Sequence, residues 1–312
     1  MNIALDMMGG DLAPGELVKG VRDYISEKTP ATLSLIGDEQ QILPLLNEAG
    51  VPANAYRIIP STEVIGMNEH PLKALKEKPN SSIAIGFGLL AAGKTDAFIS
   101  AGNTGAMLIG SLFTIKPIEG VQRPTIGTIV PMENGSTGLL LDVGANADCK
   151  AEHLDQFATL GSLYAQYILG IEKPRVGLIN IGEEEGKGNV LAQATYPLLK
   201  ANEKIHFIGN VEGRDVFLDH ADVLVCEGFT GNVILKLAES LHGIMERQNV
   251  HTEYFDRFNF EDYGGTPVLG VNKPVIIGHG ISRAKAYKNM LLLAQKMIET
   301  KLLEKMASAF KA

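Results

Sequence analysis

Polar turns that could bind an anion follow several short apolar runs in this 312-residue chain. Glycine lets the backbone approach an anion closely, and amides and hydroxyls donate hydrogen bonds to it. One such turn is common, but four of them at the ends of buried strands predict a polar cleft for a phosphate-like ligand. The substrate-binding candidates are Asp6, Gly9 and Gly10 in the first turn, Ser100, Gly102, Asn103, Thr104 and Gly105 in the second, Asp142 and Asn146 in the third, and Asn180 in the fourth.

The second turn has two interpretations. It precedes an apolar helical segment, so its backbone amides and the Thr104 hydroxyl can donate to an anion at a helix N-terminus. The alternative is that Asn103 or Thr104 only caps that helix. Taken alone, the turn leaves both open, and the three companion turns favour the anion.

Two residues are candidates for the reaction itself. Lys187, in GKGN, can attract phosphate or stabilise an oxyanion, or it can be an ordinary solvated lysine. Asn232, in GFTGN, can donate its amide to a carbonyl oxygen, or it can cap the following helix. Gly188, Thr230 and Gly231 in the same two turns complete the set of substrate-binding candidates.

One motif match is misleading. The segment from Gly88 to Thr95, GLLAAGKT, fits the phosphate-binding pattern G-x-x-x-x-G-K-[ST]. That loop requires a strand before it and a helix after it. Here the order is reversed, so we expect Gly93 to end a helix and Lys94 to lie in the turn that follows.

The elements that must position these turns alternate along the chain. Six short apolar runs are typical of buried parallel strands: NIALD, TLSLIGD, DAFIS, GLLLD, RVGLINIGEE and DVLVCEGFTGN. Their alternation with helical stretches predicts an α/β protein with a doubly wound, mostly parallel sheet, in which ligands bind beyond the carboxyl ends of the strands. We expect a single domain over 1–312, with a short helical excursion at about 233–262. Helices are expected at 14–28, 38–49, 81–93, 103–114, 151–169, 189–200 and 282–307.

Composition excludes several classes of protein. The net charge is −8 and tryptophan is absent, which argues against nucleic-acid binding. There is no basic, apolar leader and no apolar run long enough to span a membrane, so we expect a cytoplasmic protein. The two cysteines, Cys149 and Cys226, lack metal-ligand spacing, and we expect neither a disulfide framework nor a metal site.

Other catalytic chemistries lack their motifs. The chain contains no G-x-S-x-G elbow, no H-E-x-x-H and no G-x-G-x-x-G opening a helix after the first strand. A nucleophilic cysteine is conceivable, but Cys226 lies in an apolar strand, where a buried small side chain is the ordinary interpretation. His279 follows a probable strand and is expected to be structural.

Taken together, these motifs resemble one family, the phosphate acyltransferases of bacterial phospholipid synthesis (PlsX). The matching segments run through nearly the whole chain and include IALDMMGGDLAP, ISAGNTGA, LLLDVGANAD, PRVGLINIGEEEGKGN, FIGNVEGRD and GFTGNVILK. The resemblance implies a fold related to isocitrate dehydrogenases and phosphate acetyltransferases, and a homodimer. It also implies that an acyl group passes from acyl carrier protein to orthophosphate without a cofactor, giving an acyl phosphate that a glycerol-3-phosphate acyltransferase consumes.

The resemblance places Lys187 and Asn232 at the reaction centre. Our hypothesis is direct attack of a phosphate oxygen on the thioester carbonyl, with Lys187 attracting phosphate or the developing oxyanion and Asn232 donating to the carbonyl oxygen. An acidic carrier protein would need a basic landing site. The candidates are Lys73, Lys76 and Lys78, or Arg283, Lys285 and Lys288, and either group can equally be a solvated helix face.

The excursion departs from the family pattern. Many members have a long helical pair with a membrane-touching tip between GFTGN and YGG, whereas here the interval is short. An amphipathic helix is still expected at 233–245, with its apolar face used for packing in a dimer and any peripheral membrane contact weak. The alternatives to the proposed activity are a short-chain phosphate acyltransferase using acyl-CoA, a metal- and nicotinamide-dependent hydroxyacid dehydrogenase, and a non-catalytic acyl-carrier binding protein.

Overall fold

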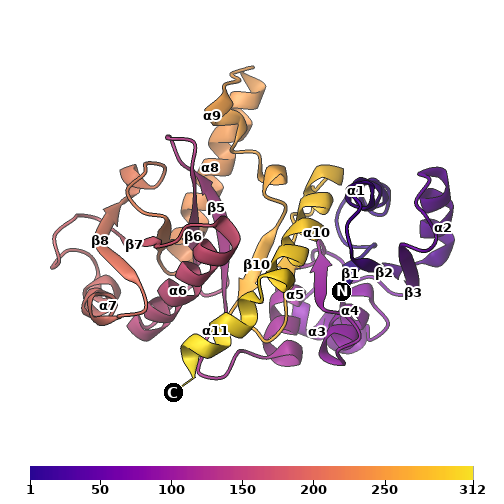
Figure 1. Cartoon of the computed structure of the whole chain (residues 1–312), viewed down its shortest axis with the longest axis horizontal. Helices are drawn as coiled ribbons and strands as arrows, with labels where there is room; N and C mark the ends of the chain where they lie inside the picture. Colours follow the sequence, from indigo (N-terminus) through magenta and orange to yellow (C-terminus); the bar gives the residue numbers. More distant parts are fainter. Residues whose placement is uncertain (312) are drawn as a thin grey trace. The chain divides into compact units, whose positions relative to one another are not determined.

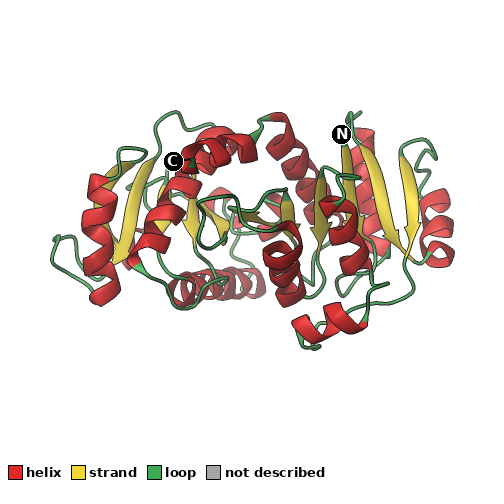
Figure 2. Cartoon of the chain, turned by 90° about the horizontal axis from the view of Figure 1, so that it is seen from below, coloured by secondary structure: helices red, strands yellow, loops and turns green. Residues whose placement is uncertain are grey.

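The computed structural model describes residues 1–311, and its contacts divide into two compact units. Unit 1 comprises Met1–Pro117 and Phe260–Leu303, and unit 2 comprises Ile118–Asn259 and the segment from Glu304 onward. Each unit contains its own part of the sheet, flanked by helices (Figures 1 and 2). The expectation of a single domain stays a prediction.

Unit 1 has six neighbouring strands in the order β3-β2-β1-β4-β11-β10. All pair in parallel except β10, which is antiparallel to β11. The central strands are buried because nearly every residue in them is apolar, and the register sets Leu5 of β1 beside Ile99 of β4. The strands are β1 (Asn2–Asp6), β2 (Thr32–Gly37), β3 (Tyr56–Pro60), β4 (Ala97–Ser100), β10 (Thr266–Leu269) and β11 (Val275–Ile277).

The helices of unit 1 pack in two groups. Helices α1 and α10 pack against each other, while α4 packs against α5 and against β1 and β4. The strand order changes direction at β1, since β2 lies on one side and β4 on the other, so the turns after β1 and β4 meet where such sheets bind ligands. The helices are α1 (Gly15–Ser26), α2 (Glu39–Glu48), α3 (Pro71–Glu77), α4 (Ser82–Ala91), α5 (Thr104–Gly110), continued by a π-turn at Ser111–Ile115, and α10 (Ala284–Glu299).

Unit 2 has the strand order β5-β6-β9-β7-β8. Here too one strand is reversed, since β5 is antiparallel to β6 and the remaining pairs are parallel. The strands are β5 (Thr125–Pro131), β6 (Thr137–Leu141), β7 (Arg175–Asn180), β8 (His206–Glu212) and β9 (Val223–Val225). The helices are α6 (Ala151–Tyr164), continued by a π-turn at Ala165–Leu169, α7 (Val190–Ala201), α8 (Gly228–Arg247) and α9 (Glu253–Asp256).

The predicted α/β fold and its principal elements are confirmed. The six apolar runs recognised as strands form β1, β2, β4, β6, β7 and β9. The edge strands β3 and β8 were not expected, because their partly exposed residues lack a continuous apolar run. The single helix expected at 282–307 is wrong: Lys301 has a φ of 53°, which separates α10 from α11 (Leu302–Phe310).

Two other expectations are confirmed. Gly93, at a φ of +67°, ends α4, and the amide of Lys94 donates to the carbonyl of Leu89, so GLLAAGKT closes a helix rather than opening one. The amphipathic helix at 233–245 lies within α8, and its apolar side chains are substantially exposed, for example Leu237 at 61%. Within residues 1–311, no helix combines the length and the apolar character needed to cross a membrane.

Candidate functional site

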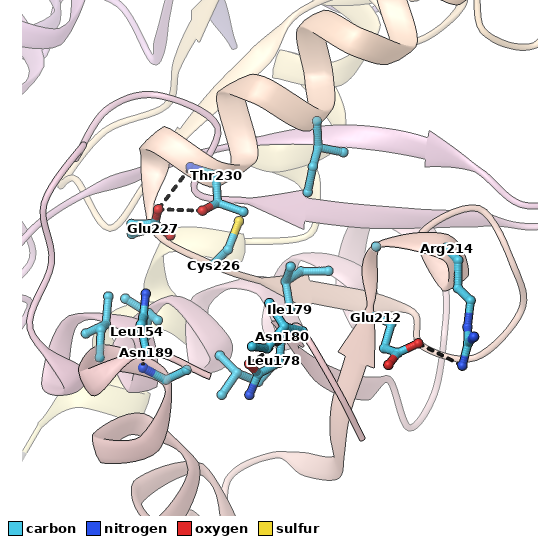
Figure 3. Close-up of a pocket in the computed structure, with 15 residues that line it drawn as sticks. Leu154, Leu178, Ile179, Asn180, Asn189, Glu212, Arg214, Cys226, Glu227 and Thr230 are labelled. Atoms are coloured by element: carbon cyan, nitrogen blue, oxygen red, sulfur yellow. Dashed lines mark hydrogen bonds and ion pairs between the residues drawn. The ribbon is translucent and has the colours of Figure 1, made fainter. Parts of the chain in front are cut away.

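A pocket of about 700 Å³ lies at the point in unit 2 where the strand order changes direction (Figure 3). The chain passes from β7 to β8 on one side and then returns to β9 on the other side of β7. The turns after β7 and β9 therefore diverge and leave a crevice beyond the carboxyl ends of these strands. The lining residues are Leu154, Leu178, Ile179, Asn180, Ile181, Asn189, Leu191, Ala192, Glu212, Gly213, Arg214, Cys226, Glu227, Thr230 and Ile234.

The polar groups of this pocket are organised by local hydrogen bonds. Glu227 caps α8, and its Oε1 accepts from the Thr230 amide at 3.0 Å and the Thr230 hydroxyl at 2.5 Å. Arg214 pairs with Glu212 at 2.7 Å, so its positive charge is already matched. The remaining lining is mostly aliphatic, which suits a ligand that is largely apolar with a few polar groups.

The loop after β7 carries Lys187 and is held by buried amides. Asn180 donates to the Lys187 carbonyl at 3.1 Å, and Asn210 of β8 donates to the Glu184 carbonyl at 2.9 Å. Gly188 has a φ of +97°, and a side chain there would collide with Asn180. The Lys187 side chain is 51% exposed, and its Nζ lies 3.8 Å from Glu184 Oε1, a surface pair that contributes little. The loop therefore has a fixed backbone and presents a lysine that is free to meet a ligand.

The first turn of α8 packs on the turn after β6. Asn232 Nδ2 donates to the Val143 carbonyl at 3.1 Å, which leaves its second N–H for another acceptor. A side chain at Gly231 would run into the Asp142 carbonyl, and one at Gly144 would approach Asn232 Nδ2 to 3.2 Å. The alternative interpretation, in which Asn232 caps α8, is wrong, because the helix starts at Gly228 and Glu227 is its cap.

Asp142 organises this turn from a fully buried position. Its Oδ1 accepts from the amides of Ile126 and Ala145, and its Oδ2 accepts from both the backbone amide and the side-chain nitrogen of Asn146. Burial raises the pKa of Asp142, although these hydrogen bonds oppose the rise. Asn146 also donates to the Pro124 carbonyl at 2.8 Å. The hydrogen-bonding atoms of both candidates are thus engaged with the protein.

Unit 1 brings its own candidates together around Asp6. The Asp6 carboxylate accepts from the amides of Met8 and Gly9 and from the Ser100 hydroxyl, at 2.7 Å in the last case. Burial raises the pKa of Asp6, and hydrogen bonds from Ser82 and Ser100 oppose the rise. The Ser100 hydroxyl also accepts from the Gly102 amide, so the turns after β1 and β4 are tied together.

Asn103 caps α5, whereas the anion-binding role of its turn stays a prediction. Its side chain accepts from the Ala106 amide at 3.0 Å and caps α5. Its Nδ2 faces the carbonyls of Gly66, Met67 and Glu69. Thr104 is exposed at the start of α5, while Gly9 and Gly10 lie close to Gly102 and Tyr287 respectively.

Neither cysteine is set up as a nucleophile. Cys226 lines the pocket but is 3% exposed, and burial raises the pKa of its thiol well above the ordinary value. Burial, helped by the nearby Asp142 charge, raises the pKa of Cys149 to about 12. Since the thiolate is the nucleophile, both thiols are inert near neutral pH.

Comparisons with known proteins identify the family of this chain. Residues 1–305 match the model of the family described as "Fatty acid synthesis protein". The chain is 46% identical to a protein of Desulforamulus reducens named phosphate acyltransferase, over 96% of this chain and 94% of that protein. A protein of the same name from Aquifex aeolicus is 44% identical with the same coverage. The chain belongs to the phosphate acyltransferase family.

Solved structures support the fold of this phosphate acyltransferase family member. A phosphotransacetylase from Streptococcus pyogenes superposes with a TM-score of 0.70 at 18% identity, covering 96% of this chain and 94% of that one. A branched-chain phosphotransacylase from Enterococcus faecalis gives a TM-score of 0.66 at 15% identity, covering 96% and 99%. At these identities the likeness shows the fold alone.

The candidates divide into one group in each unit of this enzyme. Within unit 2, Asn180 and Thr230 line the pocket, whereas Lys187, Gly188, Gly231, Asn232, Asp142 and Asn146 are absent from its lining. Three other lining residues, Glu227, Glu212 and Arg214, were not predicted from the sequence. The segment FIGNVEGRD shows the same strand-then-polar-turn pattern as the other four sites and could have identified two of them, and Glu227 immediately precedes GFTGN.

Proposed function

We propose that this enzyme transfers a fatty acyl group from the thioester of acyl carrier protein to orthophosphate, giving an acyl phosphate for phospholipid synthesis. The observation that carries the proposal is the pocket at the β7/β9 switch point, where Asn180 and Thr230 of two family motifs line one largely aliphatic cavity. Such a cavity suits the arm and chain of an acyl donor.

In the proposed reaction, a phosphate oxygen attacks the thioester carbonyl carbon. The C–O bond of the acyl phosphate forms, the C–S bond breaks, and the carrier thiolate leaves and takes up a proton. The raised pKa values of Cys149 and Cys226 support attack by phosphate itself over a cysteine-bound acyl intermediate.

Lys187 and Asn232 have the proposed catalytic roles. The ammonium of Lys187 is half exposed and only weakly paired, so it is available to attract phosphate or the developing oxyanion. Asn232 has one N–H fixed by the Val143 carbonyl and a second available for the substrate carbonyl oxygen.

The two buried aspartates have a positioning role in this proposal. Each is committed to the backbone of its own turn, and an ionised carboxylate would repel phosphate. We therefore propose that the glycine-rich backbones they hold shape a substrate-facing surface in each unit separately, with Ser100, Asn103 and Thr104 in unit 1 and with Asn146 and Thr230 in unit 2.

Acidic side chains around the pocket favour the acyl donor as its occupant. Glu212 and Glu227 both line the cavity, and the only cationic lining residue, Arg214, is paired with Glu212. A phosphate dianion would be disfavoured there, whereas an uncharged acyl arm would not. We propose that phosphate is gathered by Lys187, outside this lining.

Lysines in both candidate basic groups for carrier docking already pair with acidic side chains of this chain. In one candidate basic group, Lys78 pairs with Glu69 at 2.5 Å, and in the other Lys288 pairs with Glu27 at 2.6 Å and Lys285 pairs with Asp262.

The exposed apolar side of α8 supports the homodimer proposal, since Val233, Leu237 and Leu241 need a partner surface. We propose a cytoplasmic enzyme whose membrane contact, if any, is peripheral.

The deciding experiment combines long-chain acyl carrier protein with labelled orthophosphate and traps the product with hydroxylamine. Formation of the fatty hydroxamate, dependent on both substrates, supports the proposal. Parallel reactions with short-chain acyl-CoA distinguish the alternative donor, and failure to form any acyl phosphate from either donor would overturn the proposal in favour of a non-catalytic binding protein.

A further inference from the structure

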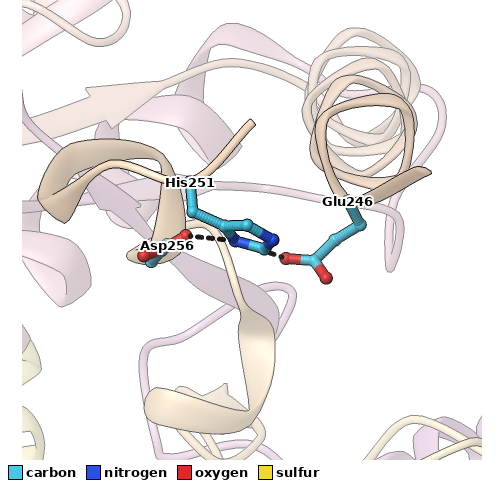
Figure 4. A group of neighbouring side chains, drawn as sticks. All are labelled: Glu246, His251 and Asp256. Carbon is cyan, nitrogen blue, oxygen red and sulfur yellow. Dashed lines mark hydrogen bonds and ion pairs between the residues drawn. The ribbon is translucent and has the colours of Figure 1, made fainter. Parts of the chain in front are cut away.

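Three side chains that can ligate a metal ion meet where α8 is followed by α9 (Figure 4). They are Glu246, His251 and Asp256, and one ligand atom from each lies within 4.8 Å of the other two. His251 Nδ1 lies 3.2 Å from Asp256 Oδ1 and 3.8 Å from Glu246 Oε1. None of the three lines the pocket described above.

The backbone fixes this arrangement. Helix α8 ends at Arg247, and Asn249, with a φ of 54°, reverses the chain. Thr252 then caps α9, accepting from the Phe255 amide at 3.1 Å, and its carbonyl accepts from the Asp256 amide at 3.0 Å. The turn and the cap therefore bring a carboxylate from each helix to the imidazole between them.

Two of the three distances between ligand atoms are close to those around a tetrahedral ion, and the third, between the carboxylates, is at most 4.8 Å. With bonds of about 2.0–2.2 Å, neighbouring ligand atoms in a tetrahedral zinc site are about 3.4 Å apart. The imidazole nitrogen already lies near this distance from one carboxylate and within half an ångström of it from the other. Because all three side chains are at the surface, small rotations can close the remaining gap.

Charge favours a cation at the same point. In the part of the chain that the structure describes, the ion pairs of Glu246 and Asp256 involve only His251. Two other acids of unit 2 differ in having a lysine partner: Glu185 pairs with Lys200 at 2.9 Å, and Glu239 pairs with Lys236 at 2.7 Å. Two carboxylates beside one imidazole therefore leave a net negative site. An imidazole in the ligand set suits zinc and its neighbours in the first transition series better than magnesium or calcium.

We propose that Glu246, His251 and Asp256 bind one zinc-class divalent ion, with solvent completing the coordination. The ion joins the end of α8 to α9 and rigidifies this part of unit 2. This inference is independent of the proposed acyl transfer, since it involves none of the residues assigned to that reaction.

Calorimetric titration of the untagged full-length protein with zinc tests the site. We expect one ion per chain and a Kd that rises about tenfold or more in His251→Ala, with smaller increases in Glu246→Gln and Asp256→Asn. The matched control is His220→Ala, because His220 is similarly exposed and lies 3.7 Å from a single carboxylate, that of Asp215. This variant should bind zinc as the parent does.

Two further measurements keep the result interpretable. Zinc should raise the melting temperature of the parent and of His220→Ala but not of His251→Ala. Cobalt should give the visible absorption of a tetrahedral site in the parent and in His220→Ala but not in His251→Ala. Equal zinc affinity in His251→Ala and the parent, or magnesium binding as tight as zinc binding, would overturn the proposal.

Discussion

The turns around Asp6 and Asp142 are both organised by a buried carboxylate, but the hydrogen-bond partners of the two carboxylates differ. Asp6 ends β1 and Asp142 directly follows β6; both are fully buried and accept hydrogen bonds from the amides of the glycine-containing turn that follows. In unit 1, one carboxylate oxygen faces the Ser100 hydroxyl, which can rotate to donate or accept. In unit 2, both oxygens face N–H groups, which can only donate.

A second pair of aspartates, one in each unit, can be compared at the amino ends of β4 and β9. Asp96, before β4, accepts from the Asn2 amide at 2.7 Å, and Asp222, before β9, accepts from the Arg175 amide at 2.7 Å. Only Asp222 also binds a guanidinium, through Arg175 Nε at 3.0 Å and Nη2 at 2.9 Å. We therefore expect the negative charge to contribute to stability at Asp222 but not at Asp96, and unfolding experiments can measure this difference.

The largest expected effect is at Lys187, the exposed lysine of unit 2 that is proposed to attract phosphate or the developing oxyanion. Lys187→Ala should lower turnover by about 10² to 10³, because it removes a charge that stabilises the transition state. The melting temperature should not change, since the side chain is half exposed and weakly paired. The control is Lys200→Ala, which removes another exposed lysine from the same unit. Turnover within about threefold of the parent would remove Lys187 from the mechanism.

The comparison of the strand-end aspartates predicts unequal asparagine variants. Asp142→Asn should cost about 3 kcal/mol of stability, because an NH₂ group would face N–H donors from Ile126 or Asn146. Asp6→Asn should cost about 1 kcal/mol, because the Ser100 hydroxyl can turn and accept from the new NH₂. Denaturant unfolding of both variants measures the difference. Equal losses would show that hydroxyl rotation does not distinguish the two turns.

A smaller, pH-dependent effect is expected at the amino end of β9. Burial alone would raise the pKa of Asp222, but hydrogen bonds from Arg175 hold this pKa below its ordinary value. The ionised carboxylate therefore stabilises the fold above the unfolded-state pKa of about 3.9, and this contribution is lost as pH falls through the lower folded-state pKa.

Asp222→Asn should thus cost about 2 kcal/mol near neutral pH, and its deficit relative to the parent should shrink below about pH 4. Asp96→Asn is the matched control, since its hydrogen bond to Asn2 involves no charged partner. Thermal unfolding across this pH range provides the measurement. A deficit independent of pH would contradict the ionic contribution.

The smallest effect is expected at the cysteines. Cys149→Ala and Cys226→Ala should each keep turnover within about threefold of the parent, because neither thiol is ionised near neutral pH. Acyl phosphate formation by each variant is the measurement. Complete loss of turnover in a folded Cys226→Ala variant would indicate an acyl-enzyme and would undermine direct attack by phosphate.

Much of the fold could be predicted because its strands are continuous apolar runs. β1, β4 and β6 are buried on both faces, so their sequences identify them without knowledge of their neighbours. The edge strands β3 and β8 could not be identified in this way, because their burial is partial and depends on which strand lies beside them. The break between α10 and α11 falls at Lys301. It could not be predicted, because a left-handed backbone conformation is ordinarily indicated by a glycine and this position has a lysine.

By itself, the sequence determined the α/β class, the family, and the polar turns at the strand ends, because these depend on residue type, order and local spacing. Only the tertiary structure decided what each polar group does. Asn103 caps α5, Asn232 does not cap α8, and Glu227 joins Asn180 and Thr230 in a pocket. A side chain's role is set by the donors and acceptors that face it, and many of these come from distant strands that the fold brings together.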